Sequence, residues 1–218
     1  MVTVSAYFKP PNNEGLEIRR GTFSRGWAML NHAAYHKLVS LRNGRQVMIS
    51  PLNGQDRNSL INFFQQVPPE DDQFCKENLK DPKVLDYWLN PENSRRIMSL
   101  VAADVATNQI VASLNVYRGQ QTALNVGEIQ QILVSRSLQG LGLGSLLMDE
   151  LIDLASREGL HWLKAEIAVD LKNIVKAFQG KGFKIRAILE DYFRDSKGAT
   201  CDVALMMLPL IKKDDKDF

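Results

Sequence analysis

Three alternating glycines, Gly140, Gly142 and Gly144, follow an apolar run and open a segment with helical periodicity. The segment reads Ile132-Leu-Val-Ser-Arg-Ser-Leu-Gln-Gly-Leu-Gly-Leu-Gly-Ser145, which predicts a strand, a short connection and a helix start. Glycine lets the main chain turn tightly and approach a ligand, and the first amides of a helix have no partner within it. Because such a helix start binds phosphate, we expect main-chain donors from Gln139 to Ser145 to hold a diphosphate.

Other phosphate-binding loops fit these glycines less well. A P-loop of the form GxxxxGK[ST] needs a lysine, and none follows Gly144. A dinucleotide fold needs GxGxxG directly after a strand, whereas here a connection intervenes and Ser145 occupies the third glycine position. Glu166 or Asp170 would then have to bind the ribose. Glycines that only permit a tight turn are a further alternative.

The elements around this loop alternate between strands and helices. Asn43-Gly44 predicts a turn between two strand-like runs, 37–41 and 46–50. Helices are predicted after Asn53 and after Asp81, which can each cap a helix. The remaining elements are strands at 100–105, 110–117 and 126–134, a helix at 142–158, a strand at 162–169, a short helix at 171–179 and strands at 183–189 and 201–208. This order predicts a mixed α/β fold.

Val134, followed by Gln139-Gly140-x-Gly142-x-Gly144, resembles the V-x4-(R/Q)-G-x-G-x-(G/A) signature of the GNAT superfamily of N-acetyltransferases. The predicted elements also follow the order of that family. The resemblance implies a twisted mixed sheet of six to seven strands, splayed between the fourth and fifth strands and flanked by about four helices. Residues 1–44 would be an N-terminal extension, residues 45–210 the acetyltransferase domain and residues 211–218 a charged tail.

The resemblance also implies that acetyl-CoA is the co-substrate and lies in the cleft made by the splay. The end of the fourth strand would pair with the pantetheine amides through Ile132, Leu133 and Val134. The diphosphate would be held by the glycine loop, which consists of Gln139, Gly140, Leu141, Gly142, Leu143, Gly144 and Ser145. No metal ion is expected.

Direct attack on a thioester needs a neutral amine, so a carboxylate must take a proton from the ammonium, directly or through water. Glu128 stands six residues before Val134, a spacing that resembles the glutamate base of the histone acetyltransferase branch. Alternatively, Glu128 only faces solvent, and Asp104, Glu166 or Asp170 presents the carboxylate from a strand end. A main-chain amide at the end of the fourth strand would stabilise the oxyanion, and we assign this role to Val134.

The position of the usual proton donor departs from the family pattern. Many relatives carry a tyrosine five positions ahead of the phenylalanine in a Gly-Phe pair, and here that position is Phe178 before Gly182-Phe183. Because a phenyl ring cannot donate a proton, the thiolate must leave unaided or use water, Tyr117 or Tyr192. Asn173 lies near the start of the same helix, where relatives often carry an asparagine. Asn173 and Phe178 are both expected to contact the cofactor.

Composition limits the partners and the compartment. Lys and Arg number 27 against 25 Asp and Glu, so the chain lacks the strong positive charge expected for a nucleic-acid partner. Cys75 and Cys201 lie far apart without metal-ligand spacing, which favours a reducing compartment. His32 and His36 have helical spacing but no evident third metal ligand. With no signal peptide and no run of about 18 apolar residues, we expect a cytoplasmic protein without a membrane partner.

We therefore expect an acyltransferase that moves acetyl from acetyl-CoA to a primary amine, of a small molecule or a protein, in a ternary complex. The alternative is an acyl-CoA-binding regulatory module with weak or lost catalysis, which Phe178 favours. The sequence does not select the acceptor. It also leaves open whether residues 1–44 cover the acceptor cleft or make a homodimer contact.

Overall fold

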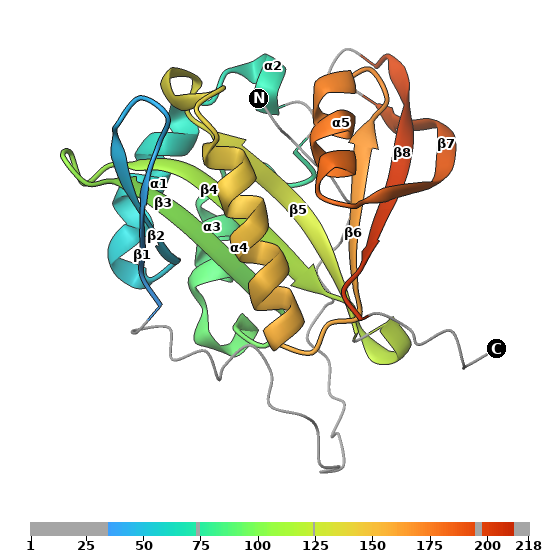
Figure 1. Cartoon of the computed structure of the whole chain (residues 1–218), viewed down its shortest axis with the longest axis horizontal. Coiled ribbons are helices and arrows are strands. Elements are labelled where there is room, and N and C mark those ends of the chain that lie inside the picture. The colour runs from blue at the N-terminus through green and yellow to red at the C-terminus, as the bar shows by residue number, and fades with distance from the viewer. Residues whose placement is uncertain (1–34, 73–74, 124, 195–197, 212–218) are drawn as a thin grey trace, which may run out of the picture.

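An open, mostly antiparallel sheet forms the centre of the fold and carries helices on both faces (Figure 1). The computed structural model describes residues 35–72, 75–123, 125–194 and 198–211. Within these residues the sheet has eight strands in the spatial order β1-β2-β3-β4-β5-β6-β8-β7: β1 (Lys37–Ser40), β2 (Gln46–Pro51), β3 (Ile97–Asp104), β4 (Ile110–Arg118), β5 (Val126–Val134), β6 (Trp162–Ala168), β7 (Lys184–Arg194) and β8 (Thr200–Pro209).

The N-terminal hairpin explains why eight strands are found where six to seven were predicted. β1 pairs antiparallel with β2 along its whole length. Gly44 has a φ of +82° at the turn, so the hairpin predicted from Asn43-Gly44 is confirmed. Tyr35 and Lys37 donate hydrogen bonds to Glu150 of α4 (Leu143–Arg157), and these bonds attach the start of the hairpin to that helix. β1 therefore lies inside the predicted 1–44 extension and yet belongs to the sheet.

Helices on the two faces of the sheet enclose two separate apolar cores. α4 (Leu143–Arg157) and α5 (Lys172–Gly180) pack with one core, and α1 (Arg57–Gln65) and α3 (Pro82–Leu89) with the other. Figure 1 shows α4 in front of the sheet and α1 and α3 behind it. A short helix, α2 (Pro69–Asp72), follows α1. The predicted mixed α/β fold is therefore confirmed.

Local signals explain where α3 begins. Asp81 has an extended main chain, and its side chain accepts a hydrogen bond of 2.9 Å from the main-chain N–H of Lys83. Pro82 occupies the first helical position, where a missing N–H costs nothing. The predicted cap at Asp81 is confirmed, and the helix that follows buries Leu85 and Trp88 against the sheet.

β5 and β6 diverge and open a split in the middle of the sheet. They pair in parallel at only three positions, from Val126 opposite Trp162 to Glu128 opposite Lys164. Beyond Glu128, β5 stays paired with β4 and β6 stays paired with β8. Figure 1 shows the two strands joined at one end and separated at the other. The predicted splay is confirmed, at the strands that become the fifth and sixth once β1 is counted.

The segments predicted at the chain ends are only partly described. Residues 1–34, which are most of the predicted N-terminal extension and include His32, lie outside the described residues. Residues 212–218, which are nearly all of the predicted charged tail, also lie outside them. The boundaries of the predicted domain at 45–210 remain a prediction.

Candidate active site

The start of α4 presents main-chain donors that have no partner inside the helix. Gly140 and Gly142 have φ angles of +74° and +96°, which glycine adopts without strain. Gly142 caps the helix without a side-chain hydrogen bond, and the first intrahelical bond runs from Leu146 N–H to Gly142 C=O at 3.0 Å. The amides of residues 143–145 therefore point out of the helix end, where its dipole also favours an anion.

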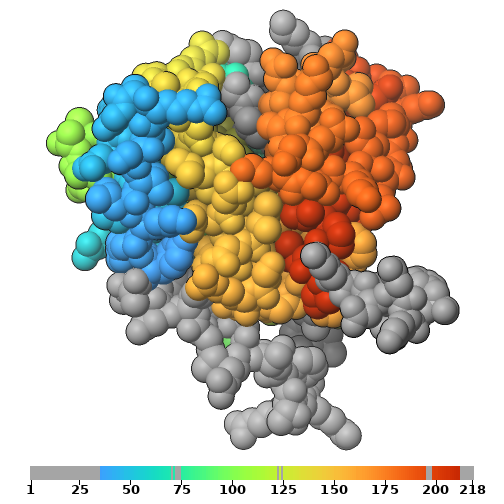
Figure 2. Space-filling model, in the orientation of Figure 1, coloured from blue at the N-terminus to red at the C-terminus, as the bar shows by residue number. Residues whose placement is uncertain are grey.

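A cavity of about 1090 Å³ lies between this helix start and α5. Figure 2 shows α4 and α5 facing one another across a hollow in the surface. The volume is slightly above the range of about 300–1,000 Å³ that is usual for ligand pockets. The predicted cofactor residues that line this cavity are Ile132, Val134, Gln139, Gly140, Gly142, Leu143, Gly144, Ser145, Asn173 and Phe178.

Leu133 and Leu141 are the two predicted cofactor residues that do not line the cavity. The side chain of Leu133 is fully buried in the core beneath α1 and α3. Leu141 packs against the other core, and its carbonyl accepts a hydrogen bond of 3.4 Å from the N–H of Arg42. Both side chains thus serve the packing around the cleft.

The main-chain direction along β5 corrects the expected role of Leu133. Ser135 N–H donates to the carbonyl of Val111 on the β4 side at 2.8 Å. Since antiparallel pairs alternate, the main-chain groups of Leu133 face β4, whereas those of Ile132 and Val134 face the split. Gln139 Nε2 donates to the Val134 carbonyl at 3.2 Å, in agreement with this direction. Ile132 and Val134, and not Leu133, therefore turn their main-chain groups toward the split.

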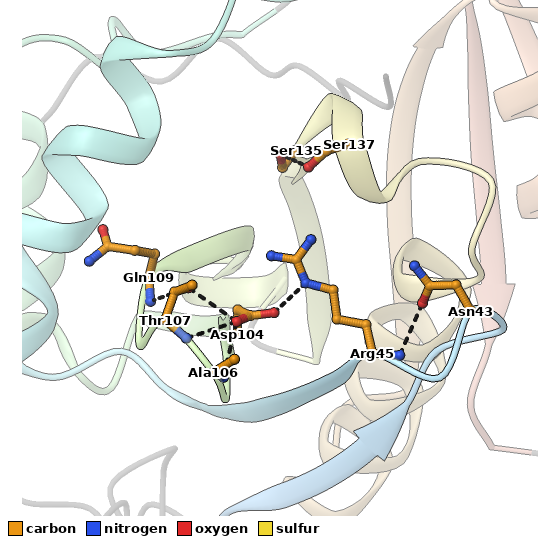
Figure 3. A network of polar contacts seen from close by, with 8 residues as sticks. All are labelled: Asn43, Arg45, Asp104, Ala106, Thr107, Gln109, Ser135 and Ser137. Atoms are coloured by element: carbon orange, nitrogen blue, oxygen red, sulfur yellow. Dashed lines mark hydrogen bonds and ion pairs between the residues drawn. The ribbon is translucent and has the colours of Figure 1, made fainter.

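The β1–β2 turn adds a cation that sequence analysis missed. Arg42 lines the cavity beside the glycine loop, and Lys172 and Lys181 line it from α5. The hairpin is held by an ion pair of 2.5 Å between Arg45 and Asp104 (Figure 3). Nothing in the spacing of the sequence indicates that a turn near residue 43 reaches the glycine loop. The cavity thus combines helix donors with positive side chains, as a phosphate ligand requires.

The carboxylate of Asp104 binds Arg45 of the hairpin and the main chain of the turn that follows β3. It accepts hydrogen bonds from the main-chain N–H groups of Ala106 and Thr107 at 3.0 and 2.9 Å, and Figure 3 shows the Arg45 side chain pointing toward it. The Arg45 guanidinium holds the pKa of Asp104 below its ordinary value. Asp104 does not line the cavity, so the structure offers it no path to a cofactor bound there.

A closed ring of four charged side chains lies at the point where β5 and β6 separate. Glu128 binds Lys76 at 3.0 Å through Oε1 and Lys164 at 2.9 Å through Oε2. Glu166 binds the same two ammonium groups, at 2.8 Å to Lys76 and 3.2 Å to Lys164. Burial alone would raise the pKa of Glu128, but the two lysines outweigh it and hold this pKa below its ordinary value. The alternative that Glu128 merely faces solvent is therefore wrong.

A second buried carboxylate, Glu77, stands beside this ring. Tyr117 lies opposite Glu128 on β4, and its hydroxyl donates to Glu77 Oε1 at 2.8 Å. Trp88 Nε1 donates to the same hydroxyl at 2.7 Å. Burial raises the pKa of both Tyr117 and Glu77. Tyr117 therefore keeps its proton in a bond to Glu77, and no sequence signal had indicated Glu77.

Phe178 stands where many relatives carry a tyrosine, and its ring is buried in the structure. Phe178 is 2% exposed, lines the cavity and packs edge-on against Phe183 with ring centroids 5.0 Å apart. Asn173 is the second residue of α5 and lines the same cavity. Tyr192, the other suggested donor, is half-exposed on β7 and lies outside the cavity lining. No tyrosine lines the cavity within the part of the chain that the structure describes.

Two further features concern metals and membranes. In the described ranges, no three His, Cys, Asp or Glu side chains gather as they would around a metal ion. None of the helices in these ranges combines the length and the apolar character that crossing a bilayer requires.

The family follows from comparison with known proteins. The model of the acetyltransferase (GNAT) family matches residues 58–183. The chain therefore belongs to the GNAT family of acetyltransferases. A curated acetyltransferase of Pseudomonas aeruginosa is 28% identical to it over 134 residues, which are 58% of this chain and 68% of the relative.

Solved structures show the same fold. The GNAT domain of the S. lividans protein PAT superposes with a TM-score of 0.66 and 20% identity, over 80% of this chain and 96% of that domain. The protein yncA of Salmonella typhimurium, solved with its cofactor acetyl-CoA, superposes with a TM-score of 0.66 and 18% identity, over 78% of this chain and 98% of that one. At these identities the likeness shows the fold alone.

Proposed function

We propose that this chain transfers the acetyl group of acetyl-CoA to a primary amine by direct attack in a ternary complex. The observation that carries this proposal is the split between β5 and β6. The donor-rich start of α4 lies at its open end, and the Glu128 carboxylate lies at its closed end. A ligand with an anionic head and a long arm matches this arrangement.

The residues around the split fit acetyl-CoA. The free amides of residues 143–145 would bind the diphosphate, and Arg42 would add positive charge. The main-chain groups of Ile132 and Val134 would pair with the amides of the arm, as a strand edge does. Gln139 would hold the Val134 carbonyl in place. When bound, acetyl-CoA supplies the activated thioester.

The acceptor amine would enter from the face that carries α3. A second cavity, of about 160 Å³, lies on that side and includes Tyr87, Tyr117, Glu128 and Gln130 in its lining. Cofactor and acceptor would thus approach the split from opposite faces of the sheet. The acceptor is a small molecule or a protein that can present a primary amine at this cavity.

Glu128 is the proposed general base, since the proton must leave the ammonium before attack. The lowered pKa keeps Glu128 ionised, so it can accept a proton, although a weak base transfers protons slowly. Glu77 has a raised pKa, but its carboxylate oxygens are taken by Tyr117 and Trp88. The Val134 amide faces the split, but about 20 Å of β5 separates it from Glu128, so the amide of Ile132, which faces the split nearer to Glu128, is the proposed donor to the oxyanion.

No side chain is assigned as the acid. Phe178 cannot donate a proton, and Tyr117 donates its proton to Glu77. The thiolate of CoA leaves unaided or takes a proton from water. Positioning the amine against the thioester supplies much of the acceleration in this scheme.

The test is CoA release from acetyl-CoA by the purified full chain, measured with a thiol reagent with and without added primary amines. The proposal predicts that release rises with amine concentration and saturates. A panel should contain polyamines, amino acids and peptides with a free N-terminus or lysine. Release that no amine in the panel increases, despite bound acetyl-CoA, would contradict the transferase proposal.

A second candidate function is an acyl-CoA-binding regulatory module with weak or lost catalysis. Phe178 in the cleft and the lysines on both oxygens of Glu128 favour it. Such a module would bind acetyl-CoA in a calorimeter and release no CoA with any amine. The same amine panel therefore separates the two functions.

A further inference from the structure

Lys76 places a primary ammonium group directly against the carboxylate of Glu128, the proposed base. Its Nζ is 3.0 Å from Glu128 Oε1 and 2.8 Å from Glu166 Oε2, and its side chain is only 2% exposed. Contacts of residues that follow Lys76 in the sequence hold this part of the main chain in place. Glu77 binds Tyr117 and Trp88, and Leu79 is buried in the core with α1 and α3.

The direction of the split brings an acyl group toward this lysine. Pairing of β5 with β6 ends at Glu128 and Lys164, so the split closes at the ring of charges. The open edge from Val134 back to Glu128 is about 20 Å long, at about 3.3 Å for each residue. An arm that starts at the glycine loop and follows this edge carries its thioester toward the ring.

The two lysines of the ring differ in how readily they lose a proton. Burial lowers the pKa of Lys76, although both glutamates oppose this shift. Burial also acts on Lys164, but Glu128 and Glu166 outweigh it and raise the pKa of that residue. A neutral amine is therefore more accessible at Lys76 than at Lys164.

We propose that Lys76 is a self-acetylation site of this protein. The inference rests on the proposed function, because acetyl-CoA is the acetyl donor. The Nζ atom of Lys76 forms an amide bond to the acetyl carbon while the carbon–sulfur bond of the thioester breaks, and the sulfur leaves with the bonding electron pair. Two protons leave the ammonium: one gives CoA its thiol, and the other reaches solvent through Glu128.

Acetylation of Lys76 would change the base beside it. The product is a neutral amide, so Glu128 would keep only the Lys164 ion pair, and its pKa would rise. Its Oε1 would be free to meet the ammonium of an incoming amine. Self-acetylation thus prepares Glu128 for an external acceptor.

The experiment incubates the full chain with acetyl-CoA and no amine, followed by intact mass measurement and peptide mapping. We expect one added acetyl group, at Lys76, with a rate constant that does not depend on protein concentration. Lys83 is the matched control, because it is exposed and lies on the adjacent helix α3. Uncatalysed acetylation would favour the exposed Lys83. Preferential labelling of the buried Lys76 would therefore show that the acetyl group is transferred within the proposed active site.

Two variants extend the test. Lys76→Arg keeps the charge and should lose the label, whereas Lys76→Gln imitates the acetylated side chain and should release CoA to added amine faster than Lys76→Arg does. Thermal unfolding of both variants checks that they fold, since a broken buried ion pair is destabilising.

The outcomes separate the inference from the proposed function. Acetyl-CoA binding and amine acetylation without a label on Lys76 would overturn the inference and leave the function intact. A label on Lys83 equal to that on Lys76, or a rate that rises with protein concentration, would overturn it as well. Absence of acetyl-CoA binding would overturn both.

Discussion

The Nζ atom of Lys164 lies 2.9 Å from Oε2 of Glu128, at the last position where β5 and β6 pair. This cross-strand ion pair marks the closed end of the split. In the proposed function it also marks where the thioester and the acceptor amine meet. We therefore expect the charge state of Glu128, and access to its oxygens, to affect turnover strongly and the affinity for acetyl-CoA only weakly.

Replacement of Glu128 by Gln should lower amine-dependent CoA release by about 100-fold, the lower end of the range for a lost general base. Acetyl-CoA affinity should stay within about threefold, because Glu128 lies outside the large cavity. Steady-state kinetics and calorimetry measure the two effects. Glu92→Gln, an exposed carboxylate, is the matched control and should change neither.

The Glu128→Gln variant leaves two lysines with one glutamate, so its stability must be known. Thermal unfolding should show a lower midpoint than the parent chain, because the ring then carries an uncompensated positive charge. The activity of the variant should be measured at a temperature well below its unfolding midpoint. Unchanged turnover in a folded variant would contradict the assignment of the base and leave the family unaffected.

The lowered pKa of Glu128 predicts a pH dependence of stability. The ordinary value is 4.5, and the folded value lies below it, so the contribution of this carboxylate is fully present above about pH 4.5. It is lost as the pH falls through the folded pKa. Denaturant unfolding of the parent and of Glu128→Gln should therefore differ most near pH 7, and the difference should shrink below pH 4.5. A constant difference at all pH values would argue against the ion pairs as its source.

Gly142→Asp should weaken acetyl-CoA binding by about 100-fold or more, which corresponds to about 2.8 kcal/mol. The new carboxylate would stand at the helix start where the diphosphate is proposed to bind, and a φ of +96° strains any side chain. Gly159→Asp is the matched control, with a φ of +73° just beyond the opposite end of α4 and open space around its Cβ position. Equal affinities of the two variants would place the diphosphate elsewhere.

Arg42→Ala should weaken acetyl-CoA binding by about three- to tenfold, since one cation near the phosphates is lost. The loss should decrease as salt rises, because added ions screen the charge. Binding isotherms at two salt concentrations measure this effect. Arg95→Ala removes an exposed arginine that does not line the cavity and should leave the affinity unchanged.

The glycine loop could be predicted from the sequence because its signal is local. Positive φ at Gly140 and Gly142, the start of α4 and the Asn43-Gly44 turn each depend on neighbouring residues. The splay of the sheet followed from the family resemblance that the loop carries. The run 37–41 was predicted as strand-like, but it was assigned to the extension because the family resemblance begins only near residue 45.

The contacts of the charged ring could not be predicted in this way. Lys76 meets Glu128 across 52 positions and Glu166 across 90, and such pairings depend on the path of the loop between α2 and α3. The direction of the main chain at Leu133 depends on the register with β4, which no single strand encodes. The approach of Arg42 to the cavity likewise needs the folded hairpin.

The most direct test of the central claim is calorimetric titration of the full chain with acetyl-CoA and, in the same buffer, with NADH. The account predicts saturable binding of acetyl-CoA at one site, none of NADH, and loss of the acetyl-CoA signal in Gly142→Asp but not in Gly159→Asp. Binding of NADH without acetyl-CoA would contradict the account, because the glycine loop would then serve a dinucleotide.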